Sequence, residues 1–243
     1  MLKVFKYLKS SIFSVLAIIL LLFIQAFLDL TLPDYTSKIV NVGVQQGGIE
    51  NAAIEKIGEN TLNKLVLFMD SNDSKYILNH YEKTDTYKGE KIYTIKEDSN
   101  IAKISSIMAK PMLIVSFAEQ SSSDNNASIS FKIPEGQDLY QVLAMMDKTQ
   151  KNTMLKDIDK KIKDIPDTII DQAAVSYVKT EYQRIGVDTD QIQTMYILKV
   201  GLIMLGIAFA AMAIGILIVF IGSRMAARLA RTLRHKVFTK VVG

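Results

Sequence analysis

The 243-residue sequence has no cysteine and only two histidines, His80 and His235. The chain therefore forms no disulfide, and a transition-metal site would have to be built from carboxylates. The motifs G-x-x-x-x-G-K-[ST], G-x-S-x-G and H-E-x-x-H are absent as well. We expect no catalytic residue, no metal and no cofactor in this chain, which leaves open whether it belongs to an enzyme.

Proline occurs only four times, at Pro33, Pro111, Pro134 and Pro166. None follows Asp188, which has Gln191 three residues later and so the spacing of a capping box that starts a helix. The sequence predicts an unbroken helix over residues 189–240, about 78 Å long. The hydrocarbon core of a bilayer is only ~30 Å thick, so much of this helix would stand in water.

Charge is absent from two long apolar runs, residues 12–28 and 200–223. With the two serines before it, the first forms about 28 Å of helix, and the second is longer than a bilayer core is thick. The flanks towards both chain ends hold lysine and arginine but no acid, so the positive-inside rule puts both ends in the cytoplasm. A cleaved signal peptide is the alternative for the first run, but no small-x-small cleavage site follows it.

These patterns predict a membrane all-α fold with two transmembrane helices, the second of which extends far into the cytosol. A mostly helical (α or α+β) extracytoplasmic domain is inserted between them. The protein is then a multi-pass protein of the cell membrane, with both termini in the cytoplasm. The expected divisions are a tail over 1–9, helices over 10–32 and 191–222, an extracellular domain over 33–190 and a cytoplasmic helix over 223–243.

Inside the extracellular domain the apolar spacing predicts several elements. Pro33 and the glycines after it indicate the end of the first helix. Asp164 is expected to cap a helix with Pro166 in its first turn, and Gly186 to end it in a left-handed conformation. The other expectations are a helix through Ile54, Ile57, Leu62, Leu65 and Met69, a strand over 91–96, an apolar run over 112–117, a polar loop over 121–126, and two amphipathic helices through Leu139, Val142, Leu143 and Met146 and through Leu155, Ile158, Ile162 and Ile165.

Polar and small residues in the spans are candidates for cargo contact and helix packing. Gln25 and Asp29 lie four apart on one face of the first span and could line a cargo path, although Asp29 at the boundary is also explained by solvation. Ala211 with Gly215, and Gly222 with Ala226, have the spacing of close helix contact, which is also common background composition in membrane helices.

The predicted cytoplasmic helix is amphipathic. Arg224, Arg228 and Arg231 fall on one face with His235, and the opposite face carries Ala226, Ala230, Leu233 and Val237. An apolar stripe in the cytosol indicates a partner helix. The basic face could bind anionic lipid or nucleic acid, but orientation across the membrane explains it, so we expect no nucleic-acid partner.

Three segments carry a family resemblance. In residues 2–43, KVFKYLKS leads into the first span and AFLDLTLPDYTSKIVNVGV leaves it. Residues 179–205 read KTEYQRIGVDTDQIQTMYILKVGLIML, and residues 223–243 read SRMAARLARTLRHKVFTKVVG. These segments resemble the half-transporters of ATP-binding cassette exporters of the multidrug type, in the bacterial branch that is often heterodimeric. The middle of the chain is similar to the enlarged extracellular insertion that some members carry between their first two spans.

The resemblance implies an N-terminal part of an exporter that moves a hydrophobic or amphipathic compound or peptide across the bacterial cell membrane. ATP and Mg would bind a nucleotide-binding domain that lies outside this chain, together with four further spans. The partner would be a second half-transporter, as a heterodimer in preference to a homodimer. The coupling positions that the resemblance implies are Leu233, Arg234, Val237, Phe238 and Lys240.

Two other interpretations stay open. A two-span sensor has the same topology, but its signalling linker commonly carries a proline soon after the second span, and here none follows Pro166. A self-contained small membrane protein would leave the apolar stripe around Leu233 without a partner. We expect the reading frame to continue beyond codon 243 into more spans and a G-x-x-x-x-G-K-[ST] motif.

Overall fold

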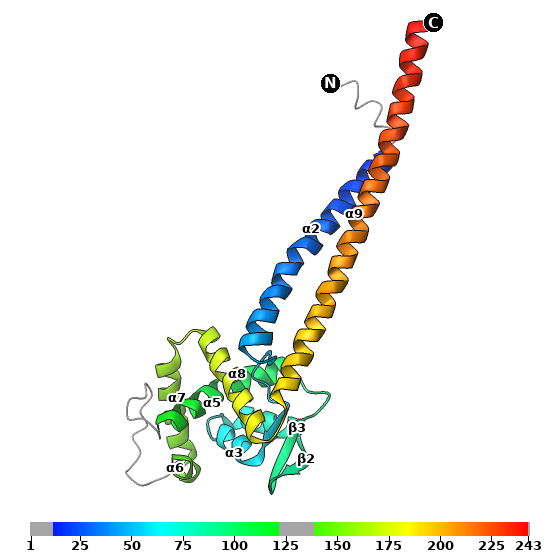
Figure 1. The fold of residues 1–243 in the computed structure, drawn as a ribbon. Coiled ribbons are helices and arrows are strands. Elements are labelled where there is room, and N and C mark those ends of the chain that lie inside the picture. The colour runs from blue at the N-terminus through cyan, green and yellow to red at the C-terminus, as the bar shows by residue number, and fades with distance from the viewer. Residues whose placement is uncertain (1–11, 122–138, 243) are drawn as a thin grey trace. The chain divides into compact units, whose positions relative to one another are not determined.

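The computed structural model describes residues 12–121 and 139–242 and is mostly helical, with one small sheet (Figure 1). The chain divides into two compact units. We call Asn41–Tyr196 the middle unit, and the described residues up to Val40 and from Ile197 onward the helical unit. The predicted tail over 1–9, the polar loop after residue 121 and the region around Pro134 lie outside the described residues.

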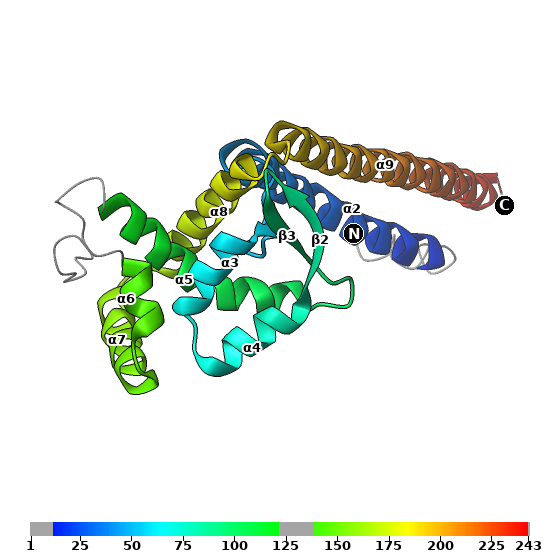
Figure 2. The ribbon, with the colours of Figure 1, turned by 90° about the horizontal axis from the view of Figure 1, so that it is seen from below.

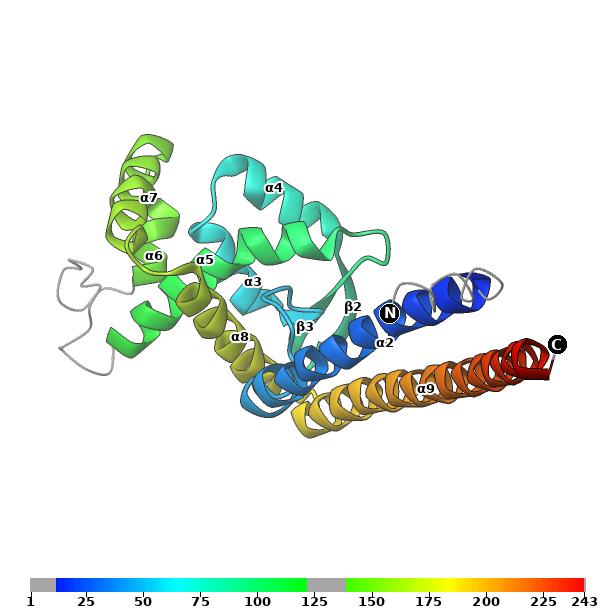
Figure 3. The same cartoon turned by 90° about the horizontal axis from the view of Figure 1, so that it is seen from above.

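Two long helices make up the helical unit. Helix α2 (Ile12–Lys38) continues as the π-helix η2 (Ile39–Gln45), and α9 (Thr189–Val242) has 54 residues without a break. In the views of Figures 1 and 3 the two helices run side by side in opposite directions. The prediction of an unbroken helix after Asp188 is confirmed. The Oδ1 atom of Asp188 accepts the N–H groups of Asp190 and Gln191, both at 3.0 Å.

The first helix ends at the predicted glycines, since η2 stops at Gln45 and the turn at Gly47 and Gly48 follows. Pro33 itself lies inside α2 and does not end it. Pro33 removes one backbone hydrogen bond, whereas a helix end would leave four carbonyl groups without helical partners. The hydroxyls of Thr31 and Thr36, on either side of the proline, donate to the carbonyls of Phe27 and Leu32 at 2.7 and 3.0 Å.

A three-stranded antiparallel sheet lies at one side of the middle unit, in the order β1 (Lys56–Gly58), β3 (Glu90–Ile95), β2 (Tyr81–Tyr87). The strand predicted over 91–96 is confirmed as β3. The helix predicted through Ile54 and Ile57 is wrong there, since these residues precede or form β1 and helix α3 begins only at Glu59. Pairing of Ile57 with Tyr93 on β3 outweighs the local helical spacing.

Six helices complete the middle unit. They are α3 (Glu59–Leu67), α4 (Ser71–His80), α5 (Ile101–Ser121), α6 (Leu139–Met145), α7 (Lys148–Ile162) and α8 (Asp167–Arg184). Helix α5 contains the apolar run over 112–117 and lies between α8 and α4 in the views of Figures 2 and 3. Five of its side chains are at most 1% exposed, namely Ile104, Met108, Met112, Leu113 and Val115.

Helix α8 closes the core from the other side. It buries an apolar stripe that includes Ile170, Ala174 and Val178. The start predicted at Asp164 is wrong, because the helix begins at Asp167 and Pro166 takes the cap position. The carbonyl of Pro166 accepts the N–H of Ile169 at 2.9 Å. The predicted end is confirmed, since Gly186 has φ +76°.

Within residues 12–121 and 139–242, three helices are long and apolar enough to cross a membrane, by length and composition. One is α2 together with η2, and another is α9. The most apolar stretch of each has no buried residue. The third is α5, of whose apolar stretch 50% is buried. Long exposed apolar helices indicate a membrane-associated protein.

Candidate functional sites

The predicted coupling residues lie together in the last turns of α9. Leu233 and Val237 are one helical turn apart, as are Arg234 and Phe238, so they form two adjacent rows on the helix surface, and Lys240 follows on the same helix. Leu233, Val237 and Phe238 are 37%, 62% and 70% exposed. An apolar surface of this kind is available for packing against another helix.

The two candidate cargo residues occupy different surroundings. The Nε2 atom of Gln25 lies 4.0 Å from the position that a Cβ of Gly215 would take, so the amide faces α9. Asp29, one turn further along α2, is exposed. The other predicted packing glycine, Gly222, has nothing within 4 Å of such a Cβ position. Gly215 is thus the small residue of this set that lies beside a side chain of the first helix.

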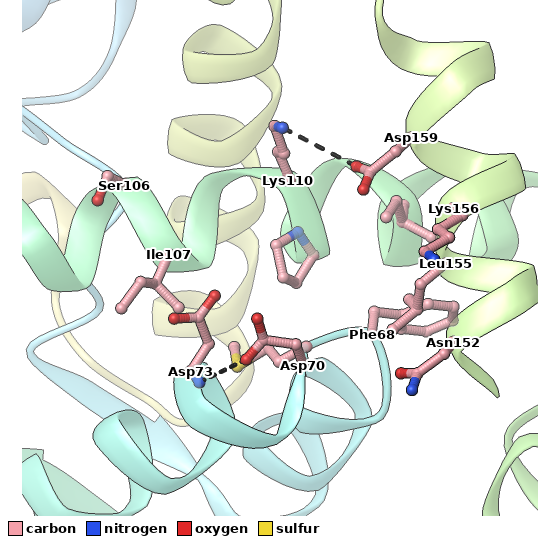
Figure 4. A pocket seen from close by; sticks show the side chains of 13 residues that line it. Phe68, Asp70, Asp73, Ser106, Ile107, Lys110, Asn152, Leu155, Lys156 and Asp159 are labelled. Carbon is pink, nitrogen blue, oxygen red and sulfur yellow. Dashed lines mark hydrogen bonds and ion pairs between the residues drawn. The ribbon is translucent and has the colours of Figure 1, made fainter. Parts of the chain in front are cut away.

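The middle unit contains a pocket of about 520 Å³ that the sequence analysis missed (Figure 4). It lies where the α3–α4 connection, α5 and α7 meet. Apolar and charged side chains line it together: Phe68, Met69, Ile107, Pro111, Ile114 and Leu155 with Asp70, Asp73, Lys110, Lys156 and Asp159, besides Ser106 and Asn152. No sequence motif predicts the pocket, because its lining residues come from elements up to about 90 residues apart in the chain.

Charges in this pocket are largely engaged by the protein. Asp70 accepts the N–H groups of Asn72 and Asp73 at 2.8 Å and so caps α4, and the amine of Lys110 lies 3.9 Å from Asp159. Burial, and secondly the charge of Asp70, raise the pKa of the Asp73 carboxyl. The described lining residues include three aspartates and two lysines but no histidine.

A charged network joins α8 to the sheet and to the start of α3. Glu181 is 3% exposed, and its carboxylate accepts the N–H of Gly58 and the hydroxyl of Thr61, both at 2.9 Å. Arg184 donates to Glu181 at 2.7 and 2.8 Å and to Glu90 at 2.6 and 3.1 Å. Glu90 in turn accepts the N–H of Asn60 at 2.9 Å. Two carboxylates from distant elements therefore accept N–H groups at the start of α3, those of the cap residue Gly58 and of Asn60.

Acid should weaken this network. The hydrogen bonds from Arg184 hold the pKa of the Glu90 carboxyl below its ordinary value of 4.5. The unfolded chain therefore binds more protons than the folded chain near that pH, and stability is lost as the pH falls from about 5 through the lowered pKa. We expect Glu90→Gln to flatten the pH dependence of urea unfolding below pH 5, and Glu97→Gln, at an exposed position, to leave it unchanged. Equal slopes for wild type and Glu90→Gln would contradict the assignment.

The described residues contain no group of three or more His, Cys, Asp or Glu side chains placed to hold a metal ion. Comparisons of the chain with protein-family models, with curated proteins and with solved structures find no match.

Proposed function

We propose that this chain is the N-terminal transmembrane part of an ATP-driven exporter, which supplies two spans and an extracellular domain to a half-transporter. The observation that carries the proposal is the length of α9. Its 54 residues correspond to about 81 Å of continuous helix, more than twice the thickness of a hydrocarbon core. Its last turns keep Leu233, Val237 and Phe238 exposed, which suits contact with further helices of a larger transporter.

The two-span topology is part of the proposal, with the divisions 1–9, 10–32, 33–190, 191–222 and 223–243. Burial of α5 supports it, because a helix whose apolar side chains fill a core has little apolar surface left for lipid. The absence of acids after Asp190 supports a cytoplasmic end for α9. Both termini then lie in the cytoplasm of a bacterial cell, and the middle unit lies outside.

In the complete protein, ATP with Mg would bind at paired nucleotide-binding domains contributed by this half-transporter and by a second, non-identical one. The cargo would be a hydrophobic or amphipathic compound or peptide, with Gln25 and Asp29 as candidate contacts. Movement of helices such as α9 would exchange inward and outward access. The exposed rows around Leu233 and Phe238 would transmit that movement.

The topology can be tested with single cysteines, because the chain has none of its own. A cysteine at exposed Ser71, at the start of α4, should react with a membrane-impermeant thiol reagent on intact cells. A cysteine at Thr239 should react only after the membrane is opened. Labelling of the Thr239 position from outside, or protection of the Ser71 position in intact cells, would overturn the two-span arrangement.

The coupling assignment can be tested with Phe238→Ala in the complete exporter. Because Phe238 is 70% exposed in this chain, the substitution should leave expression and folding unchanged. If its ring seats a neighbouring helix, cargo-stimulated ATPase activity and transport in reconstituted vesicles should fall about tenfold, which corresponds to ~1.4 kcal/mol, less than a fully buried Phe contributes.

Arg231→Ala is the control for that experiment, since Arg231 is exposed on the basic face of the same segment. We expect near-normal coupling in this variant. Wild-type behaviour of Phe238→Ala would remove Phe238 from the coupling surface, and a complete protein that hydrolyses no ATP in any variant would remove the exporter proposal itself.

A further inference from the structure

The segment that contains the end of η2 and the turn after it meets the first two turns of α9 inside the middle unit. The first of these segments is residues 43–50 and the second is residues 189–196, and all of them belong to the middle unit. They are the points at which the chain enters and leaves that unit. We refer to their junction as the neck.

Backbone meets backbone at Gly48 in the neck. Gly48 has φ +82°, and a Cβ there would lie 2.9 Å from the Cα of Gln193 and 2.9 Å from the carbonyl oxygen of Ile192. A side chain at this position would be strained by its dihedral angle and would also collide with main-chain atoms that have no freedom to rotate away. The N–H of Gly48 donates to the carbonyl of Val42 at 2.8 Å, which fixes the turn that brings Gly48 against α9.

Two side-chain hydrogen bonds also join the two segments of the neck. The Nε2 atom of Gln193 donates to the carbonyl of buried Gly43 at 2.9 Å. The hydroxyl of Tyr196, one turn further along α9, donates to Glu50 at 3.1 Å. Ile49 lies between these anchors and is 7% exposed in the core of the unit.

From this geometry we infer that the neck is a clamp, in which the close approach of Gly48 and the hydrogen bonds of Gln193 and Tyr196 hold the chain's entry and exit as one body. The first two turns of α9 are thereby part of the middle unit, although the helix itself continues to Val242. A rearrangement of the middle unit then acts on both long helices together. The inference goes beyond the proposed function and stands whether or not the chain belongs to an exporter.

Hydrogen exchange of the full chain in detergent micelles tests the clamp, with Gly48→Val compared with Gly89→Val. Gly89 has nearly the same dihedral, φ +86°, but nothing lies within 4 Å of its Cβ position, so the pair separates the collision from the shared backbone strain. We expect amides of residues 41–50 and 193–196 to exchange at least about tenfold faster in Gly48→Val, while α5 keeps its protection. Gly89→Val should leave the neck amides as in wild type.

Neck protection in Gly48→Val equal to that in Gly89→Val would overturn the inference. If Gly48→Val also unprotects α5, the milder pair Gln193→Ala and Gln191→Ala decides. Gln191 is exposed on the same helix and donates to Asp188 through its main-chain N–H, which the substitution keeps. Faster exchange at residues 43–50 in Gln193→Ala alone supports the clamp. Equal exchange in the two glutamine variants would contradict it.

Discussion

Glu181→Ala is expected to lower the unfolding free energy of the middle unit by about 2–4 kcal/mol, because each buried polar group that loses its partner typically costs about 1–3 kcal/mol. The carboxylate is 3% exposed and accepts from Gly58, Thr61 and Arg184. Its loss leaves a buried N–H and a buried hydroxyl without their acceptor, and an arginine that keeps only Glu90. The carboxylates of Glu181 and then Glu90 raise the pKa of Arg184 above its ordinary value. The Arg184 side chain is 41% exposed, so without Glu181 it keeps Glu90 and water as partners and adds little to the cost.

The measurement is urea unfolding of the full chain in micelles, followed by near-ultraviolet circular dichroism. The chain has no tryptophan, and eight of its ten tyrosines lie between residues 41 and 196, so the signal reports chiefly on the middle unit. Glu97→Ala, at an exposed position, should change the unfolding free energy by less than about 0.5 kcal/mol. If Glu181→Ala lowers the unfolding free energy by less than about 1 kcal/mol, water replaces the carboxylate and the network does not stabilise the middle unit.

Local patterns in the sequence were sufficient where one element decides its own conformation. Asp188 caps α9 and Gly186 ends α8, because each acts on main-chain groups within a few residues. The stripe on α8 was also predictable from its spacing. Distant chain segments decide the failure at Ile57, whose helical spacing yields to pairing with β3. The cap expected at Asp164 failed locally, by a few residues at an element boundary, and Pro33 lies inside α2 instead of ending it.

The same distinction explains what the sequence revealed about the candidate sites. The rows around Leu233 and Phe238 are local to one helix, so their surface could be described from the sequence, and their role in coupling stays a prediction. Burial of Glu181 could not be anticipated, since Gly58 and Glu90 are 123 and 91 residues away along the chain and only the fold brings them together. The same is true of the pocket between α5 and α7.

Leu113→Ala should cost about 2–5 kcal/mol of unfolding free energy, the typical range for a leucine truncated in a packed core. Leu113 is 1% exposed in the middle of α5, next to Met112 at 0%. Because α5 is long and apolar enough to cross a membrane, the result bears on topology as well. In a lipid-facing helix the acyl chains would fill the space left by the truncation, and the cost would be small.

Ile101→Ala on the same helix is the matched control, because Ile101 is 40% exposed and its truncation leaves no enclosed cavity. We expect a change below about 1 kcal/mol for this variant, measured by the same unfolding assay. A comparable effect of the two substitutions would contradict a buried α5. A large effect for Leu113→Ala alone means that α5 uses its apolar face to hold the middle unit together, which leaves α2 and α9 as the helices free to contact lipid.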